Sequence, residues 1–328
     1  MEVLRLFSLS RVYYIASILP ITKTIVKKFE QVMGKFIWNK SGWILRVSLD
    51  EVKNELKRGG LNLVCLKSMC DSLHVSQFLR LLKSSDVKSL SHVGFWIGDS
   101  MCELQSSLSS TACPVRIPDY YANIEALVVE AKVDGLITVN VWKCLTNKQI
   151  HHHHTSSLPV CKIEQESGVS YQRIWSLINL PILRSEERQV SYLLVHNKLP
   201  IQERLFRIDL RNDHYCQLCD LASICDTEQY FTSCTRVVSV WQCIREGLIN
   251  MVGDFTDRDL LNFMWSSSAQ DKEAVWLLGS FIARVWFNES LHPIKREEIF
   301  GYLKFKFKAD QLGSRHQMND IPSLHMVI

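Results

Sequence analysis

The chain has 328 residues, of which 47% are hydrophobic and 22% are charged. This composition excludes an intrinsically disordered chain, and the length is enough for about two domains with cores of their own. The formal net charge of +4 is a mild basic excess, which permits a polyanionic partner without requiring one.

The eleven cysteines alone would fit a secreted protein, but the N-terminal sequence does not. Its longest apolar run, residues 12–21, is too short to span a membrane and is not followed by a small-residue cleavage site. We therefore expect an intracellular protein, in the nucleus or the cytoplasm, with reduced thiols and no membrane partner.

Residues 1–83 are predicted to form a helical domain. Apolar residues recur at three- and four-residue steps over residues 3–18, 25–37 and 64–82, which predicts three helices. Pro20 ends the first of them, and the pair Gly59-Gly60 provides a permissive turn before the third.

The same block is basic. Residues 1–60 contain eleven Lys and Arg residues against five Asp and Glu residues, an excess larger than that of the whole chain. A lysine-rich helix beside a tryptophan can follow a phosphate backbone while the ring stacks on a base. The alternative is a solvated helix face with a buried tryptophan. The candidate nucleic-acid-binding residues are Lys23, Lys27, Lys28, Lys35 and Trp38.

Residues 84–158 are predicted to form an irregular connecting region. Residues 84–115 are rich in serine and lack periodicity, and a short helix around residues 124–128 precedes a predicted strand over residues 136–142. The run His151 to His154, with the Ser- and Pro-containing segment after it, indicates a linker. Four adjacent imidazoles cannot all converge on one metal ion, so we assign this run no metal role.

From residue 159 onward the pattern is helical again. We expect a domain over residues 159–250 and a C-terminal helical extension with a basic end over residues 251–328. The predicted helices cover residues 185–197, 200–208, 236–249 and 271–290, and a last one starts at Pro293. The basic end adds the nucleic-acid candidates Lys304, Lys306 and Lys308. The predicted fold class is mostly α, with two or three helical lobes and a small degenerate zinc-knuckle hairpin.

That hairpin contains the motif Cys216-Gln-Leu-Cys219. Two thiolates separated by two residues can face one ion, and Cys234 follows after fourteen further residues. A tetrahedral zinc site needs a fourth ligand, but the position five residues before Cys234 is occupied by Gln229. Its amide oxygen is a poor ligand for zinc.

Three interpretations of the hairpin stay open. Zinc can be bound by the three cysteines with Cys225 or His214 as a substitute fourth ligand. The hairpin can also be free of metal and held by packing alone, through Leu218, Phe231 and Trp241. The third interpretation is a weak site that fills only at high zinc concentration.

The run from Asp226 to Cys234, with Trp241 after it, resembles the end of the zinc-binding region in non-LTR (LINE-type) retrotransposon reverse transcriptases. In that family the run contains an acidic pair, a histidine, two apolar residues, a spacer and a cysteine, so Gln229 is a departure. The preceding segments are also similar to the family's two helices before the cysteine pair: Trp175, Ser185 to Gln189, Tyr192 to Leu194, His196 and Leu199 to Leu205.

The N-terminal block resembles the helical thumb that follows the polymerase palm in the same enzymes. The similarity lies in the order of five short segments: Ile18-Leu19-Pro20, Phe36 to Asn39, Arg46, Gly59-Gly60-Leu61 and Leu79 to Leu82. The resemblance implies a C-terminal part of such an enzyme that begins inside the thumb.

The resemblance also implies a fragment without catalytic residues. Nucleotidyl transfer uses two metal ions held by paired aspartates, and the sequence has no Asp-Asp pair, no P-loop and no G-x-S-x-G motif. We expect no enzyme activity from this chain, zinc as the candidate cofactor, RNA or DNA as the partner and no small-molecule substrate. The alternative is a structural or protein-interaction module from a decayed element that retains no activity.

Overall fold

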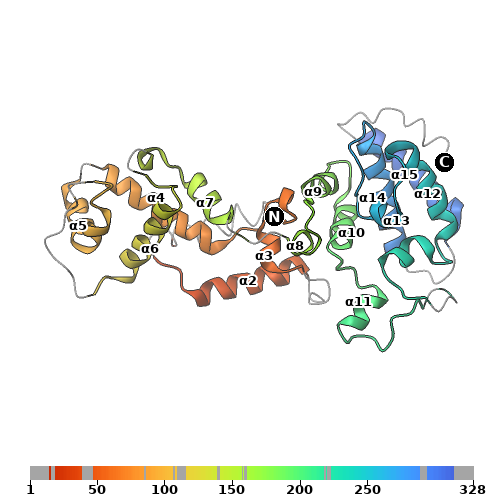
Figure 1. Cartoon of the computed structure of the whole chain (residues 1–328), viewed down its shortest axis with the longest axis horizontal. Helices are drawn as coiled ribbons and strands as arrows, with labels where there is room; N and C mark the ends of the chain where they lie inside the picture. The colour runs from red at the N-terminus through yellow and green to blue at the C-terminus, as the bar shows by residue number, and fades with distance from the viewer. Residues whose placement is uncertain are drawn as a thin grey trace. The chain divides into compact units, whose positions relative to one another are not determined.

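The computed structural model (Figure 1) confirms a mostly α fold, with 67% of the described residues helical. It describes residues 15, 19–38, 47–84, 86–105, 108, 116–138, 141–156, 158, 161–217, 219, 223–288 and 294–313. Within these ranges the extended pairing is a single isolated antiparallel bridge, between Tyr215 and Ile224, and no β-strand forms. No helix in the described ranges is long and apolar enough to cross a membrane.

The described residues fall into two compact units. The first contains residues 15–37, 49–55 and 60–158, and the second contains residues 38, 47–48, 56–59 and 161–313, each with the gaps given above. The predicted helix over residues 3–18 lies, apart from Ile15, outside the described residues.

The first unit is built on α4, a helix of eighteen residues whose sides contact α5, α6 and α7. One apolar core joins these helices, from Val75 on α4 to Ile150 on α7, with Trp142 fully buried between them. The helices of this unit are α2 (Lys23–Trp38), α3 (Leu49–Lys53), α4 (Leu66–Lys83), α5 (Val87–Met101), α6 (Asp119–Val133), the 3₁₀ turn η4 (Trp142–Cys144) and α7 (Asn147–Ser156).

The prediction of an irregular region over residues 84–158 is therefore wrong. The helices α5, α6 and α7 supply much of the core that α4 shares, because their apolar residues meet only once the helices pack together. The predicted strand over residues 136–142 is also wrong, since its described residues, 136–138 and 141–142, form bends, a turn and the start of η4. The histidine run belongs to α7, where His153 Nε2 lies 3.0 Å from an Asp134 carboxylate oxygen.

The helix α2 confirms the second predicted helix, but only part of its apolar face is covered. Met33 is buried, and Phe29 packs beside Leu66, whereas Ile25, Val32 and Phe36 are exposed. An ion pair attaches this helix to α3, with the Lys53 ammonium 2.7 Å from the Glu30 carboxylate and 2.9 Å from that of Asp50. Burial lowers the pKa of Lys53, but these two carboxylates outweigh it and raise that pKa overall.

The second unit is also helical, and its predicted helices are confirmed with shifts of a few residues at their ends. Its elements are η2 (Leu56–Arg58), α8 (Lys162–Ser167), α9 (Gln172–Ile178), α10 (Ser185–Val195), α11 (Gln202–Arg207), the π-helical turn η5 (Gln229–Ser233), α12 (Val238–Val252), α13 (Asp257–Leu261), α14 (Asp271–Phe287) and α15 (Arg296–Gly313). Gly59, which follows η2, has a φ of +77°, as the predicted permissive turn requires.

The helix α14 lies at the centre of this unit, in contact with α9, α10, α12 and α15. The sequence predicts one apolar face for it, but every residue from Ala274 to Ala283 is buried. A helix that is apolar on all sides is enclosed by its neighbours. Trp241 of α12 packs against Phe281 of α14 with ring centroids 5.5 Å apart, which ties the segment after the cysteine motif to this core.

A buried group of charges joins α15 to α10 and α14. The ammonium of Lys306 has no exposed surface and lies 3.2 Å from the Glu187 carboxylate and 2.8 Å from that of Asp310. Asp310 also accepts hydrogen bonds from Arg184 at 2.7 Å and from the Trp276 indole at 3.0 Å. These donors satisfy a carboxylate that burial alone would penalise.

We expect the Asp310 carboxylate to make the stability of this unit depend on pH. Burial raises its pKa, but the hydrogen bonds from Lys306, Trp276 and Arg184 outweigh burial and hold the pKa below its usual value. A carboxyl with a lowered folded-state pKa stabilises the fold above its unfolded-state pKa and loses that contribution as pH falls.

Urea unfolding measures this contribution. The free energies of unfolding of the native chain and of Asp310→Asn are compared at each pH from 7 down to about 3. The difference is expected to shrink across the acid end of that range. A constant difference would contradict the role given to Asp310.

Candidate metal centre

The segment between α11 and α12 brings the cysteines of the predicted knuckle together. Around the Tyr215–Ile224 bridge, the Cys216 backbone N–H donates to the Ser223 carbonyl at 3.1 Å, and the Cys225 N–H donates to the His214 carbonyl at 2.8 Å. This short hairpin is followed by η5, whose last turn leads directly into Cys234. The cysteine pair and Cys234 therefore come from two local structures that face each other.

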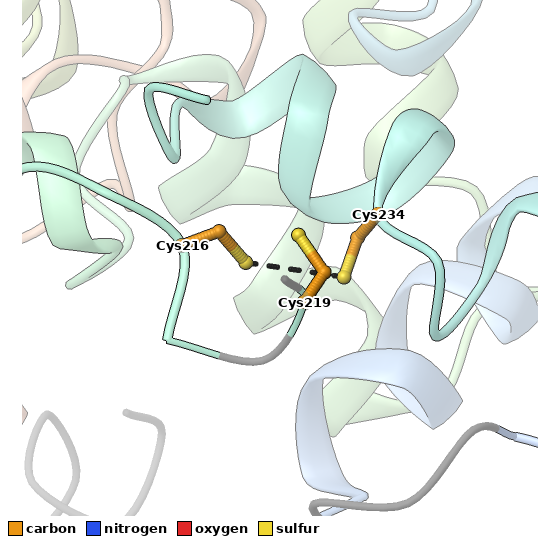
Figure 2. A group of neighbouring side chains, drawn as sticks. All are labelled: Cys216, Cys219 and Cys234. Carbon is orange, nitrogen blue, oxygen red and sulfur yellow. Dashed lines mark hydrogen bonds between the residues drawn. The ribbon is translucent and has the colours of Figure 1, made fainter. Parts of the chain in front are cut away.

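The three thiols form one cluster (Figure 2). The Sγ atoms of Cys216, Cys219 and Cys234 lie within 4.8 Å of one another, and those of Cys216 and Cys234 are 3.9 Å apart. Sulfurs bound to one ion at about 2.3 Å are about 3.8 Å apart in a tetrahedron and about 4.0 Å apart in a trigonal plane. The cluster could thus hold a metal ion through three sulfur ligands.

Gln229 occupies the position where a fourth ligand is expected. Its side chain is 8% exposed and points to the cluster, with Nε2 donating to Cys219 Sγ at 3.3 Å. Within the described part of the chain, its amide oxygen Oε1 is buried without a hydrogen-bond partner. The backbone thus directs this side chain at the thiols, but the amide is a poor ligand for a soft ion.

The two substitute fourth ligands proposed from the sequence, Cys225 and His214, both lie outside the three-sulfur cluster. Cys225 is buried on the far side of the hairpin and makes a side-chain hydrogen bond with Cys216, but it is not part of the three-sulfur cluster. His214 instead contacts the Phe206 and Tyr215 rings, with centroids 5.0 and 4.5 Å away. Neither residue completes a four-ligand set in this structure. Leu218 lies outside the described residues.

Burial sets the protonation of these thiols. It raises the pKa of Cys234 to about 12 and that of Cys225 to about 12, with the neighbouring Cys216 as a further cause for each. Without a metal both groups are neutral thiols at pH 7. A metal ion must displace protons to bind, so its affinity increases with pH.

The nucleic-acid candidates fall into two groups. On α2, Lys23, Lys27, Lys28 and Lys35 are all exposed, while the Trp38 side chain lies outside the described part. On α15, Lys304 and Lys308 are exposed. Lys306 is not, and the prediction that it contacts nucleic acid is wrong, because its ammonium is enclosed with Glu187 and Asp310.

A buried Cys–His contact was not predicted from the sequence. Cys161 Sγ lies 3.6 Å from His196 Nδ1, and the other ring nitrogen of His196 lies 3.1 Å from the Gly59 carbonyl. His196 also stacks on Trp175 with centroids 4.8 Å apart. No spacing signal relates Cys161 to His196, since 35 residues separate them.

No family model, no curated protein and no solved structure matches this chain.

Proposed function

We propose that this chain is a non-catalytic nucleic-acid-binding part of a reverse transcriptase of the non-LTR (LINE) type, with a small metal site that stabilises one lobe. The observation that carries the proposal is the convergence of Cys216, Cys219 and Cys234 at the site expected from the resemblance, with Gln229 directed at them. Zinc is the metal that the resemblance implies for such a site.

The exposed side of α2 supports the binding of a polynucleotide. Lys28 and Lys35 are two turns apart on one side of the helix, next to the exposed apolar residues Val32 and Phe36. Phe36 is 59% exposed. Lysines can contact phosphates while a neighbouring aromatic ring stacks on a base. A surface of this kind binds single-stranded nucleic acid without preference for its base sequence.

Charge reversal on α2 tests this function. We expect Lys28→Glu with Lys35→Glu to weaken binding of single-stranded RNA more than tenfold at about 0.1 M salt. Loss of two phosphate contacts also reduces the slope of log affinity against log salt by about 1.4. Fluorescence anisotropy with a labelled oligonucleotide measures both. The matched control is Lys148→Glu with Lys272→Glu, which reverses two exposed lysines elsewhere and keeps the same net charge.

Equal weakening by both double variants would show that only net charge matters. Absence of RNA and DNA binding by the native chain at about 50 mM salt would contradict the proposal.

A second candidate function is a structural or interaction module from a decayed element. The observation in its favour is Gln229, because loss of the fourth ligand removes part of what a zinc knuckle needs to fold. Purified protein with neither metal nor nucleic-acid affinity would favour this second function.

A further inference from the structure

The zinc site implied by the resemblance does not fit the residues present. Structural zinc sites are almost always four-coordinate, whereas the cluster offers three sulfurs. The neighbouring polar side chain is Gln229, whose nitrogen donates to Cys219 Sγ at 3.3 Å and whose amide oxygen is a poor ligand for zinc. An ion that binds here must therefore accept three thiolates without a strong fourth ligand.

We propose that the three thiols form a trigonal site selective for a soft monovalent ion, Cu(I), over Zn²⁺. This inference rests on the metal site of the proposed function and specifies its ligand. Thiolates suit both Cu(I) and Zn²⁺, so the number of ligands, three rather than four, is what favours Cu(I) here. Cu(I) accepts three sulfur ligands in a plane. The 3.9 Å between Cys216 Sγ and Cys234 Sγ allows this arrangement, although it fits a tetrahedral one equally well.

Two N–H groups donate hydrogen bonds to sulfurs of the cluster. Such hydrogen bonds stabilise the thiolate form in which the cysteines bind a metal ion. Besides the Gln229 amide on Cys219, the backbone N–H of Arg236 donates to the Cys234 sulfur. Hydrogen bonds to a charged acceptor are stronger than those to a neutral one, and such outer contacts tune ligands around metals. Gln229 in this arrangement is a positioning residue that holds Cys219 Sγ.

The strongest alternative for this site is a four-thiolate zinc centre. Cys225 hydrogen-bonds to Cys216 from the opposite side of the hairpin, and rotation of its side chain would supply a fourth sulfur. The two alternatives differ in what Cys225 does. In the trigonal site Cys225 is a neighbour, and in the four-thiolate site it is a ligand.

Metal titrations of the full chain distinguish them. The protein is titrated anaerobically with Cu(I) against a chromophoric Cu(I) chelator, and separately with Zn²⁺ against a zinc indicator. We expect one Cu(I) per chain to bind at least a hundredfold more tightly than Zn²⁺. Cys219→Ser and Cys234→Ser are each expected to weaken Cu(I) at least a hundredfold, while Cys225→Ser changes its affinity less than threefold.

Cys243→Ser is the matched control, because this thiol lies on α12 outside the cluster. X-ray absorption of the Cu(I) form should show three sulfur neighbours. The proposal is overturned by a Zn²⁺ affinity equal to or above that of Cu(I), by loss of binding in Cys225→Ser, or by no tight site for either ion. RNA binding of the same preparation tests the proposed function separately. If the site does not prefer Cu(I) to Zn²⁺, the RNA-binding result still shows whether the proposed function holds.

Discussion

Lys306→Met is expected to lower the free energy of unfolding by about 3–5 kcal/mol, because it removes one partner of a buried ion pair. Methionine keeps most of the side-chain volume, so the loss is mainly electrostatic. The carboxylate of Glu187 is 3% exposed and would lose the cation 3.2 Å away. Its remaining donors, the Ser280 hydroxyl and the Arg184 backbone N–H, do not neutralise its charge.

Urea unfolding followed by tryptophan fluorescence measures this loss, since the Lys306 ammonium lies 4.6 Å from the centre of the Trp276 ring. The matched control is Lys304→Met, two residues earlier on the same helix and exposed, which should change stability by less than about 0.5 kcal/mol. Adding Glu187→Gln to Lys306→Met should restore a large part of the loss, because the uncompensated charge is gone. If the two single methionine variants are equally stable, Lys306 is not in a buried ion pair.

The three lysines of α15 show why a basic run is a weak guide to a binding surface. Lys304, Lys306 and Lys308 are spaced by two, and each step of two turns a helix by about 200°. Lys306 must then face away from its two neighbours, which the helical prediction for this segment already required. The sequence does not show what Lys306 faces, because its partner Glu187 lies more than a hundred residues earlier.

The helices within residues 84–158 escape prediction from the sequence for a different reason. The helices α5 and α7 are rich in serine or histidine, and each has a narrow apolar side. Their helical state depends on packing against α4 rather than on their own composition, as Ile150 buried in the shared core illustrates. Periodicity finds helices with wide apolar faces, such as α14, and misses those that depend on tertiary contacts.

For the metal centre, spacing was sufficient to predict which thiols meet. Cys216, Cys219 and Cys234 converge, because a turn between two cysteines and a short hairpin are local features. The direction of the Gln229 amide and the contact between Cys225 and Cys216 were beyond prediction. Both depend on side-chain rotamers across the hairpin, about which sequence spacing carries no information.

Gln229→His is expected to convert the cluster into a four-ligand zinc site. The glutamine Nε2 already lies 3.3 Å from Cys219 Sγ, so an imidazole on the same backbone position can place a nitrogen beside the three thiolates. We expect zinc affinity to rise about a hundredfold or more. In zinc well above both dissociation constants, a hundredfold difference in affinity is worth about 2.7 kcal/mol of folding stability. This corresponds to roughly 5–10 °C in Tm for a unit of this size.

Calorimetric zinc titration and thermal unfolding with and without a chelator measure both effects. Gln229→Leu is the matched control, since leucine is apolar and donates no ligand atom, and it should gain no zinc affinity. The stabilisation of the histidine variant should disappear with the chelator and decrease as pH falls, because protons compete with zinc for imidazole and thiolates. If the histidine and leucine variants bind zinc equally, position 229 does not face a bound ion, and the cluster is held together by packing around Phe231 and Trp241 instead.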